Sequence, residues 1–380
     1  MKRELDRIEI PDEHDARERS WAILSAAFAE REPQPRRRSW KPAVAIAVAL
    51  VVVAGLLSPP GMAVLDELRQ AVALESESAA VVTLPSRGRV LVAAEGGTWI
   101  VKPDGSRRRL GVYTSATWSP RGIFVAVSSP AGLTALDPQG NVRWSLPRKR
   151  VIWPRWAPSG FRIAYLADGR LRVVVGDGTG DRLLAANAGP NAPAWEPAIN
   201  VHVLAYADRA GRIHVVDTDS GQQRWRSDPG DLNVQLEWSS DGTRLLALGA
   251  QNLRIFQGNG VLLRTIPTGG GPASVSFRRN GHSFAFARRV AGGRSEVVVL
   301  PAERTGGARS IFRGAGAFGE IAWSPDGKWV LVPWASADQW VFVRLGRPPR
   351  IVTESEITRY FSPAAPGGVF PTLSGWCCAG

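Results

Sequence analysis

Residues 321–334 read IAWSPDGKWVLVPW, in which an aromatic residue is followed by a turn and then by an apolar run. The Pro-Asp-Gly of this stretch is typical of a tight turn, because glycine supplies the positive φ that such turns require. The apolar run after it is short, which indicates a buried β-strand. Residues 116–127 (ATWSPRGIFVAV) and 236–249 (LEWSSDGTRLLALG) repeat the same order of aromatic, turn and strand.

This unit recurs seven times, and the last copy is the most degenerate. Successive aromatic residues are separated by 38, 39, 43, 39, 46 and 38 positions. Such spacing is close to the roughly 40–45 residues of one four-stranded propeller blade. Each aromatic residue is large enough to fill the gap between two blades, so we expect these anchors to be buried. The anchors are Trp118, Trp156, Trp195, Trp238, Phe277, Trp323 and Phe361.

The two ends of the repeat region complement each other. Residues 89–112 contain strands but lack the turn motif, whereas the copy at Phe361 has the turn and little chain after it. A single blade shared by both ends would close the ring, in which every blade buries its faces against its neighbours. We therefore predict an all-β fold over residues 88–380, a β-propeller of about seven four-stranded blades. Six or eight blades also fit the spacing.

The motifs WSPRG at Trp118, WSSDG at Trp238 and WSPDGK at Trp323 resemble the repeats of TolB-type and WD-repeat-like bacterial propellers. The resemblance implies the fold over residues 88–380, and it implies no particular activity, because such propellers have many functions. Two stretches, ALDPQGNVRW and VVDTDSGQQRW, also resemble the outer strands of pyrroloquinoline-quinone-type propellers. That family's cofactor residues have no counterparts in this sequence, so we predict no cofactor.

An uncharged apolar run, PAVAIAVALVVVAGLL, covers residues 42–57, and its apolar character extends to Leu65. A membrane span needs about 20 apolar residues, so residues 42–65 are predicted to form one transmembrane helix. Arg36, Arg37, Arg38 and Lys41 precede the run and acidic residues follow it, which places the N-terminus in the cytoplasm. The 41 residues before the run are too many for an ordinary cleaved signal peptide, so an uncleaved signal anchor is favoured.

The cytoplasmic tail, residues 1–41, is predicted to contain a short amphipathic helix. Trp21, Leu24 and Phe28 fall on one face of that helix, where they form a candidate contact with a partner or with the membrane. Residues 66–87 form a juxtamembrane neck and linker, which leads to the propeller on the extracytoplasmic side.

The formal net charge is +13, and the excess lies in the C-terminal domain. From Ser86 onward there are 36 basic and 21 acidic residues. This excess is typical of a basic surface and favours anionic partners over nucleic acid, because the domain is predicted to be exported. Two basic clusters after predicted hairpins are candidate docking surfaces. They consist of Arg107, Arg108 and Arg109 and of Arg148, Lys149 and Arg150. A second kind of candidate surface is an exposed aromatic patch formed by Trp329, Trp334 and Trp340.

The sequence offers little that indicates catalysis. His202, His214 and His282 are spread over strands and turns, and Asp217–Gly221 has only the first half of a calcium loop. No nucleophile elbow or phosphate-binding loop is present. Cys377 and Cys378 are adjacent, a spacing that rarely closes a comfortable disulfide, so an inert pair, an intermolecular link or a soft-metal site stay open.

These observations predict a membrane-anchored, extracytoplasmic propeller that binds a protein or an anionic cell-wall polymer. Neither catalysis nor a metal site is expected. A sensor of a small ligand bound in the central channel is an alternative, and a lyase or hydrolase on a propeller scaffold is a further one. A charged channel with convergent groups would favour the sensor, and a flat aromatic or basic rim would favour the interaction module.

Overall fold

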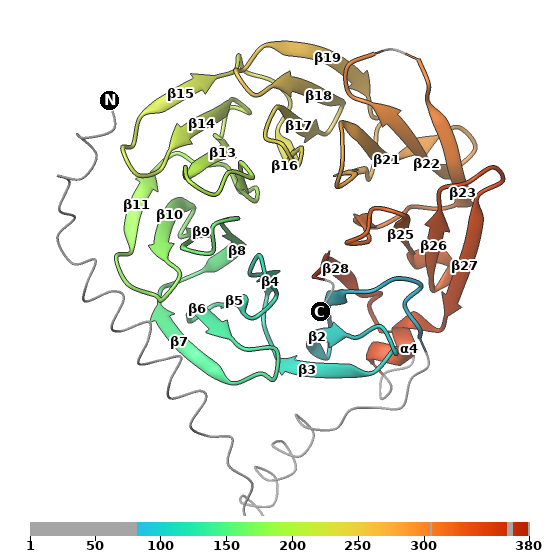
Figure 1. Cartoon of the computed structure of the whole chain (residues 1–380), viewed down its shortest axis with the longest axis horizontal. Coiled ribbons are helices and arrows are strands. Elements are labelled where there is room, and N and C mark those ends of the chain that lie inside the picture. Colours follow the sequence, from blue (N-terminus) through green and yellow to red (C-terminus); the bar gives the residue numbers. More distant parts are fainter. Residues whose placement is uncertain (1–81, 305, 363–367, 379–380) are drawn as a thin grey trace, which may run out of the picture. The chain divides into compact units, whose positions relative to one another are not determined.

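The computed structural model describes residues 82–304, 306–362 and 368–378, and these form a propeller of seven four-stranded sheets (Figure 1). The predicted all-β propeller and its seven blades are therefore confirmed. Within the described part of the chain, no helix is long and apolar enough to cross a bilayer. The predicted span at residues 42–65 and the tail with Trp21, Leu24 and Phe28 lie outside the described residues.

The innermost strand of each blade lines the central channel and carries an aromatic anchor at or near its end. Its side chains alternate between the channel and the neighbouring blade, because successive strand residues point to opposite faces. The innermost strands are β4 (Ser115–Trp118), β8 (Val151–Trp156), β12 (Ala194–Trp195), β16 (Asn233–Trp238), β20 (Ser274–Phe277), β24 (Ala322–Trp323) and β28 (Thr372–Cys377).

The second strand of each blade supplies most of the core. These strands are almost continuously apolar, because both of their faces are covered by neighbouring blades. In ring order they are β5 (Val125–Ser129), β9 (Arg162–Ala167), β13 (Val203–Ala207), β17 (Arg244–Gly249), β21 (Ser283–Val290), β25 (Trp329–Trp334) and β1 (Arg89–Ala94).

The third and fourth strands become progressively more polar toward the rim. The third strands are β6 (Gly132–Leu136), β10 (Arg170–Val175), β14 (Ile213–Asp217), β18 (Asn252–Gln257), β22 (Arg294–Pro301), β26 (Gln339–Arg344) and β2 (Gly97–Val101). The outermost strands are β7 (Val142–Pro147), β11 (Arg182–Ala185), β15 (Gln223–Arg226), β19 (Leu262–Pro267), β23 (Arg309–Ala315), β27 (Arg350–Ser355) and β3 (Arg107–Gly111).

The ring is closed by a blade that both ends of the chain share. β28 pairs with β1 in the order β28-β1-β2-β3, and Val90 lies opposite Trp376 in the register. The sequence prediction of a shared blade is therefore correct, but its anchor was placed wrongly. Phe361 lies in the short helix α4 (Ile357–Phe361), where it is buried among the core side chains beside Trp340.

The seventh anchor is Trp376 rather than Phe361. The six anchors from Trp118 to Trp323 are 6–9% exposed, and Trp376 is 8% exposed at the same position of its blade. The prediction failed because Thr372–Cys377 follows α4 and is not followed by the turn and apolar strand that mark the other copies.

Indole groups link several blades directly. Nε1 of Trp195 donates to the Arg155 carbonyl (2.9 Å), and Nε1 of Trp323 donates to the Ser276 carbonyl (2.9 Å). Trp238 makes the equivalent bond to Ala194 at 3.2 Å. In each case the acceptor is the residue before the anchor of the preceding blade. Phe277 has no such donor, so the junction between β16 and β20 must be joined differently.

The propeller has two faces, which the antiparallel topology defines. The turns after the anchors lie on one face, which we call the entry face because the described chain enters there. Leu84 donates its N–H to Pro103 in the hairpin between β2 and β3, and Gly88 packs against Pro325 in the turn after Trp323. The loops between blades lie on the opposite face, which we call the distal face.

Candidate functional site

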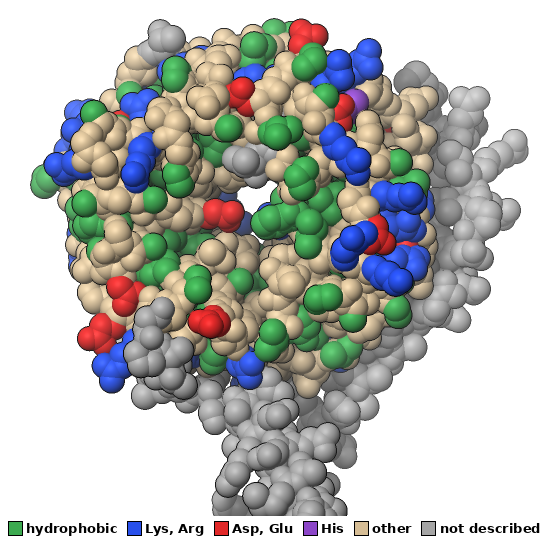
Figure 2. All heavy atoms as spheres, turned by 180° about the vertical axis from the view of Figure 1, so that it is seen from behind, with side chains coloured by type: hydrophobic (Ala, Val, Ile, Leu, Met, Phe, Trp, Pro, Cys, Tyr) green, Lys and Arg blue, Asp and Glu red, His purple; other side chains and the backbone are tan. Residues whose placement is uncertain are grey.

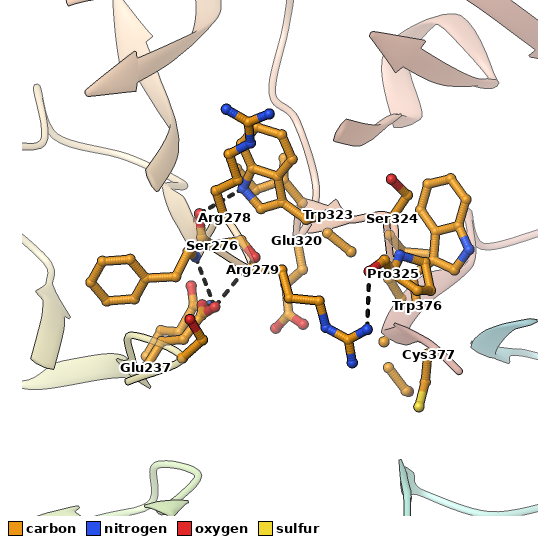
Figure 3. Close-up of a pocket in the computed structure, with 18 of the residues that line it drawn as sticks. Glu237, Ser276, Arg278, Arg279, Glu320, Trp323, Ser324, Pro325, Trp376 and Cys377 are labelled. Carbon is orange, nitrogen blue, oxygen red and sulfur yellow. Dashed lines mark hydrogen bonds between the residues drawn. The ribbon is translucent and has the colours of Figure 1, made fainter. Parts of the chain in front are cut away.

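A pocket of about 380 Å³ lies in the wall of the central channel (Figure 3). It is lined by the innermost strands and following turns of four consecutive blades, which begin with β16, β20, β24 and β28. The carboxyl groups of Glu237 and Glu320 and the guanidinium of Arg279 belong to this lining, and we call it the channel pocket. Its volume is within the range of about 300–1,000 Å³ that is common for small-ligand sites.

Glu237 joins the blades of β16 and β20, where the anchor Phe277 has no indole donor. Its Oε1 accepts a hydrogen bond from the Phe277 N–H (2.8 Å) and one from the Ser276 hydroxyl (3.3 Å). Two residues earlier, the Gln235 amide donates to the Val275 carbonyl (2.7 Å) and accepts from the Val275 N–H (3.0 Å). These side chains therefore connect β16 to β20 at the channel wall.

The charges in the channel perturb one another. Burial raises the pKa of Glu237 to about 7, and the Glu320 carboxylate adds to this rise, whereas hydrogen bonds from Phe277 and Ser276 oppose it. Burial also raises the pKa of Glu320, against the attraction of Arg155. Burial lowers the pKa of Arg155, and the charge of Glu320 counteracts this effect. Arg155 and Glu320 therefore interact, although they lie in different blades.

The predicted aromatic patch is wrong for two of its three residues. Trp340 is 0% exposed and Trp329 is 6% exposed, and both belong to the core of the closing blade. Trp334 is half-buried, and its indole donates to the Ala315 carbonyl at 2.7 Å. Trp329 lies on the second strand and Trp340 on the third strand of the same blade, and both side chains point into the core. The tryptophans of this blade therefore pack the core and do not form a surface.

The first basic cluster forms a poor docking surface. Arg107 is 9% exposed, and its guanidinium lies over the rings of Tyr360 (4.2 Å) and Trp99 (5.0 Å). Arg109 donates through Nε to the Gly96 carbonyl at 2.6 Å, and Arg108 is half-buried. The cluster lies on β3 itself, where alternation turns Arg107 inward, so the prediction of an exposed cluster is wrong for Arg107.

The second basic cluster is exposed and larger than the sequence indicates. Arg148, Lys149 and Arg150 lie in the loop between β7 and β8 on the distal face, and all three are exposed. Arg148 pairs with the buried carboxylate of Asp181 (2.6 Å), and Arg150 pairs with Asp168 (2.7 Å) in the next hairpin.

Two further arginines extend this surface. Arg170 follows Asp168 closely in the chain and is exposed. Arg209, from the next blade, approaches Gly169 so closely that a Cβ there would lie 3.4 Å from its Nη2. Figure 2 shows Lys and Arg side chains gathered over the blade of β8–β11 on this face. We call Lys149, Arg150, Arg170 and Arg209 the basic patch.

The histidines hold turns together. His202 contacts the hydroxyl of Ser159 through Nε2 (3.1 Å) and the carboxylate of Asp219 through Nδ1 (2.7 Å). This connectivity resembles a Ser-His-Asp triad. Two observations favour a structural role: Asp219 also pairs with Arg162 (2.5 Å), and the arrangement recurs at another blade junction.

At that second junction a threonine takes the place of the serine. His282 contacts Thr243 (2.9 Å) and Asp241 (2.7 Å), and it also pairs with Glu303. Both histidine clusters lie among turns of the entry face and connect neighbouring blades. His214 pairs with Asp208 (3.0 Å) within its own blade.

No group of three or more potential metal ligands occurs among the described residues. Asp217, from the incomplete calcium-loop pattern, accepts backbone N–H groups of Asp219 and Ser220 and so stabilises a hairpin turn. Cys377 and Cys378 form a disulfide with each other, the pairing that their adjacency disfavoured.

Sequence reasoning missed Arg155, Glu237 and Glu320, three charged residues that lie just before anchors at the channel. A usable signal was present: Arg155 and Glu237 each precede an anchor by one position, and Glu320 precedes its anchor by three. Because strand side chains alternate, a residue one or three positions before a buried anchor faces the channel.

Comparison with known proteins shows the fold alone. No family model and no curated protein matches the chain. Among solved structures, the β-propeller domain of Cps50 (Swd1) from Myceliophteria thermophila is similar, with a TM-score of 0.51 at 13% identity, covering 64% of this chain and 86% of that chain.

Two further structures show the same similarity. A chain of a mitotic checkpoint complex has a TM-score of 0.54 at 14% identity and covers 86% of this chain and 90% of its own. Kuenenia stuttgartiensis hydrazine synthase has a TM-score of 0.50 at 16% identity, covering 61% and 76%. This chain therefore shares the propeller fold with WD40-type structures, at identities too low to transfer a function.

Proposed function

We propose that this protein is a membrane-anchored, extracytoplasmic interaction module whose distal face binds an acidic protein partner. The observation that carries the proposal is the basic patch. The side chains of Lys149, Arg170 and Arg209 make no hydrogen bond or ion pair with another described residue, so their charges are free to meet a partner. An exposed cluster of one sign steers association with a partner of the opposite sign.

The position of the patch supports the same proposal. The chain enters the propeller on the entry face at Leu84 and Gly88, whereas the basic patch lies on the distal face. With residues 42–65 as a signal anchor, the patch would point away from the attachment point. One of the similar structures is a chain of a mitotic checkpoint complex, which agrees with a binding role.

We further propose that the protein is not an enzyme. The Ser159–His202–Asp219 cluster is the nearest approach to a catalytic arrangement in the described chain. Its duplication around His282 and its pairing with Arg162 support a fastening role at blade junctions. A sensor of a small ligand is a second candidate function, and the charged, convergent channel pocket favours it.

The test of the interaction module uses the full-length protein in cells, with crosslinking and identification of captured proteins. The variant Lys149→Glu, Arg170→Glu, Arg209→Glu reverses the free charges of the patch. Its matched control, Arg121→Glu, Lys328→Glu, Arg347→Glu, reverses three exposed charges elsewhere and changes the net charge equally. At about 0.5–1 kcal/mol for each exposed charge pair, the patch variant should bind its partner about 10–100-fold more weakly.

Three outcomes separate the possibilities. A protein that is captured by the wild type and the control but lost in the patch variant supports the proposal. Equal capture by all three forms would show that the patch is not the interface. Retention of an anionic wall polymer, with no protein captured, would replace the proposed partner class. Protease added to spheroplasts tests the topology, because an extracytoplasmic propeller is cleaved from its tail.

A further inference from the structure

Most side chains that face the channel just before an anchor are uncharged. The residues at this position are Thr117, Arg155, Ala194, Glu237, Ser276, Ala322 and Gly375. Only Arg155 and Glu237 carry charge there, and Glu320 adds a third charge two positions earlier on its own blade. The small residues Ala322 and Gly375 lie on the side of the channel that contains the pocket, where they leave space. Charge and free volume therefore coincide in one part of the ring.

One oxygen of Glu237 is committed to the protein and the other is not. Oε1 accepts the bonds from Phe277 and Ser276 that join the two blades. Oε2 has only a long contact of 3.5 Å with the Gln235 amide. Among the described residues, no cation forms an ion pair with Glu237. Its second oxygen is therefore available to a donor in the pocket.

Glu320 is the more accessible carboxylate. It makes no hydrogen bond or ion pair with a described residue, and its side chain is open to the channel, although the surrounding protein is close enough to raise its pKa. Its charge is felt by Glu237, so the two carboxylates repel each other. Figure 3 shows both groups at the same pocket, with Arg279 reaching past Glu320 to donate to the Pro325 carbonyl (3.0 Å). Arg279 forms no ion pair with either carboxylate among the described residues.

We propose that the channel pocket binds a small organic cation through a primary ammonium group held between Glu237 and Glu320. This inference develops the sensor candidate and does not depend on the basic patch. An ammonium carries three donors, enough to reach Oε2 of Glu237 and the Glu320 carboxylate together. The bound charge would remove the repulsion between these groups, which solvent and Arg155 only partly relieve.

The shape of the pocket favours an aliphatic amine over a bare metal ion. Metal ions are held by several convergent ligands, and the described residues contain no group of three. The edges of Trp238, Phe277 and Trp323 and the side chain of Leu373 provide apolar walls beside the carboxylates. A short hydrocarbon chain that carries an ammonium matches this combination of polar and apolar lining.

The test is isothermal titration of the full-length protein in detergent with 1,5-diaminopentane, and with 1,5-pentanediol as the uncharged ligand of the same length. At pH 8.5 we expect saturable binding of the diamine and none of the diol. At pH 6 we expect weaker binding, because protonation of Glu237 removes one of the two charges. Equal binding of the diol, or absence of diamine binding, would overturn the proposal.

Variants locate the site. Glu320→Gln should weaken diamine binding at least tenfold, and because Glu320 makes no hydrogen bond with a described residue and interacts with Arg155 only through its charge, this variant should fold normally. Asp228→Asn, which removes an exposed charge outside the pocket, is the matched control. Unchanged affinity in Glu320→Gln would refute the assignment. Partner capture by the distal face is measured separately, so failure of the amine site and failure of the interaction module remain distinguishable.

Discussion

Removal of the closing strand tests how the ring is held together. Truncation after Phe361 deletes β28 but keeps helix α4 and the anchor that the sequence predicted. If Trp376 is the seventh anchor, this form loses the innermost strand of the closing blade and exposes β1 along its whole length. If Phe361 were the closing anchor, the same truncation would leave the ring intact.

The size of the effect follows from what β28 buries. Trp376 is 8% exposed and packs edge-on against Phe342, and Leu373 is 4% exposed. Loss of a buried tryptophan costs about 3–5 kcal/mol and loss of a buried leucine about 2–5 kcal/mol. The ladder between β28 and β1 adds about 0.5–1.5 kcal/mol for each hydrogen bond. The total, about 10 kcal/mol, is comparable to the whole stability of a typical domain.

The assay is urea unfolding of the full-length and truncated proteins, followed by tryptophan fluorescence. We expect no cooperative transition after truncation at Phe361, and a normal transition after truncation at Cys378, which leaves β28 in place. Trp376→Ala should lower the unfolding free energy by about 3–5 kcal/mol, against about 0.5 kcal/mol or less for the exposed Thr372→Ala. A cooperative transition of unchanged midpoint after truncation at Phe361 would refute this account of closure.

Three further predictions concern packing, pH and reactivity. Trp340→Ala should destabilise the fold by about 3–5 kcal/mol and the half-buried Trp334→Ala by clearly less, as measured by urea unfolding, because Trp340 is a core residue. Asp181→Asn should cost about 1.5–3 kcal/mol at pH 7, because it removes the charge of a buried carboxylate that accepts from the partly buried Arg172 and the exposed Arg148. Burial alone would raise the pKa of Asp181, but hydrogen bonds from Arg172, Tyr165 and Arg148 outweigh burial, and the pKa in the folded protein is lowered. The charged carboxylate therefore stabilises the fold above the unfolded pKa of about 4, and this stabilisation is lost as the pH falls through the folded pKa. Unfolding curves should therefore converge for wild type and Asp181→Asn at low pH. Finally, Ser159 should not be labelled by a fluorophosphonate probe in the folded protein, and labelling at Ser159 that His202→Ala abolishes would contradict the non-catalytic proposal.

The repeat spacing was enough to predict the propeller, because almost every blade packs against its neighbours through the same order of anchor, turn and strand. The copy at Phe361 was misplaced because that order is broken in the last blade. There, the innermost strand and the second strand come from opposite ends of the chain, so no turn joins them. A search for the turn motif finds Ser362 and Pro363 after Phe361 and misses Trp376, whose only marker is its position opposite β1.

The basic patch and the channel pocket were harder to predict, because they depend on which residues of different strands and blades lie side by side. Trp329 and Trp340 look like a patch in the sequence, but strand pairing turns both into the core. The basic patch needs Arg209 beside Gly169, a contact between two neighbouring blades from residues about 40 positions apart in the chain. Glu237 and Glu320 meet only because their blades both converge on the channel. The strand periodicity within one blade can be recognised in the sequence. Which charged residues of different blades lie close together follows only from the closed ring.

The net charge of +13 overstates the positive surface that the propeller offers, because many arginines have structural roles. Arg107 lies over two aromatic rings, and Arg288 and Arg313 both pair with the buried carboxylate of Glu296. Arg172 and Arg148 share Asp181 in the same way. When these paired groups are left aside, Lys149, Arg170 and Arg209 of the basic patch are cations from different blades whose side chains have no partner among the described residues. If composition alone set the affinity for anions, reversing any three exposed charges would have the same effect. The structure predicts instead that reversal at Lys149, Arg170 and Arg209 matters more than an equal reversal at Arg121, Lys328 and Arg347.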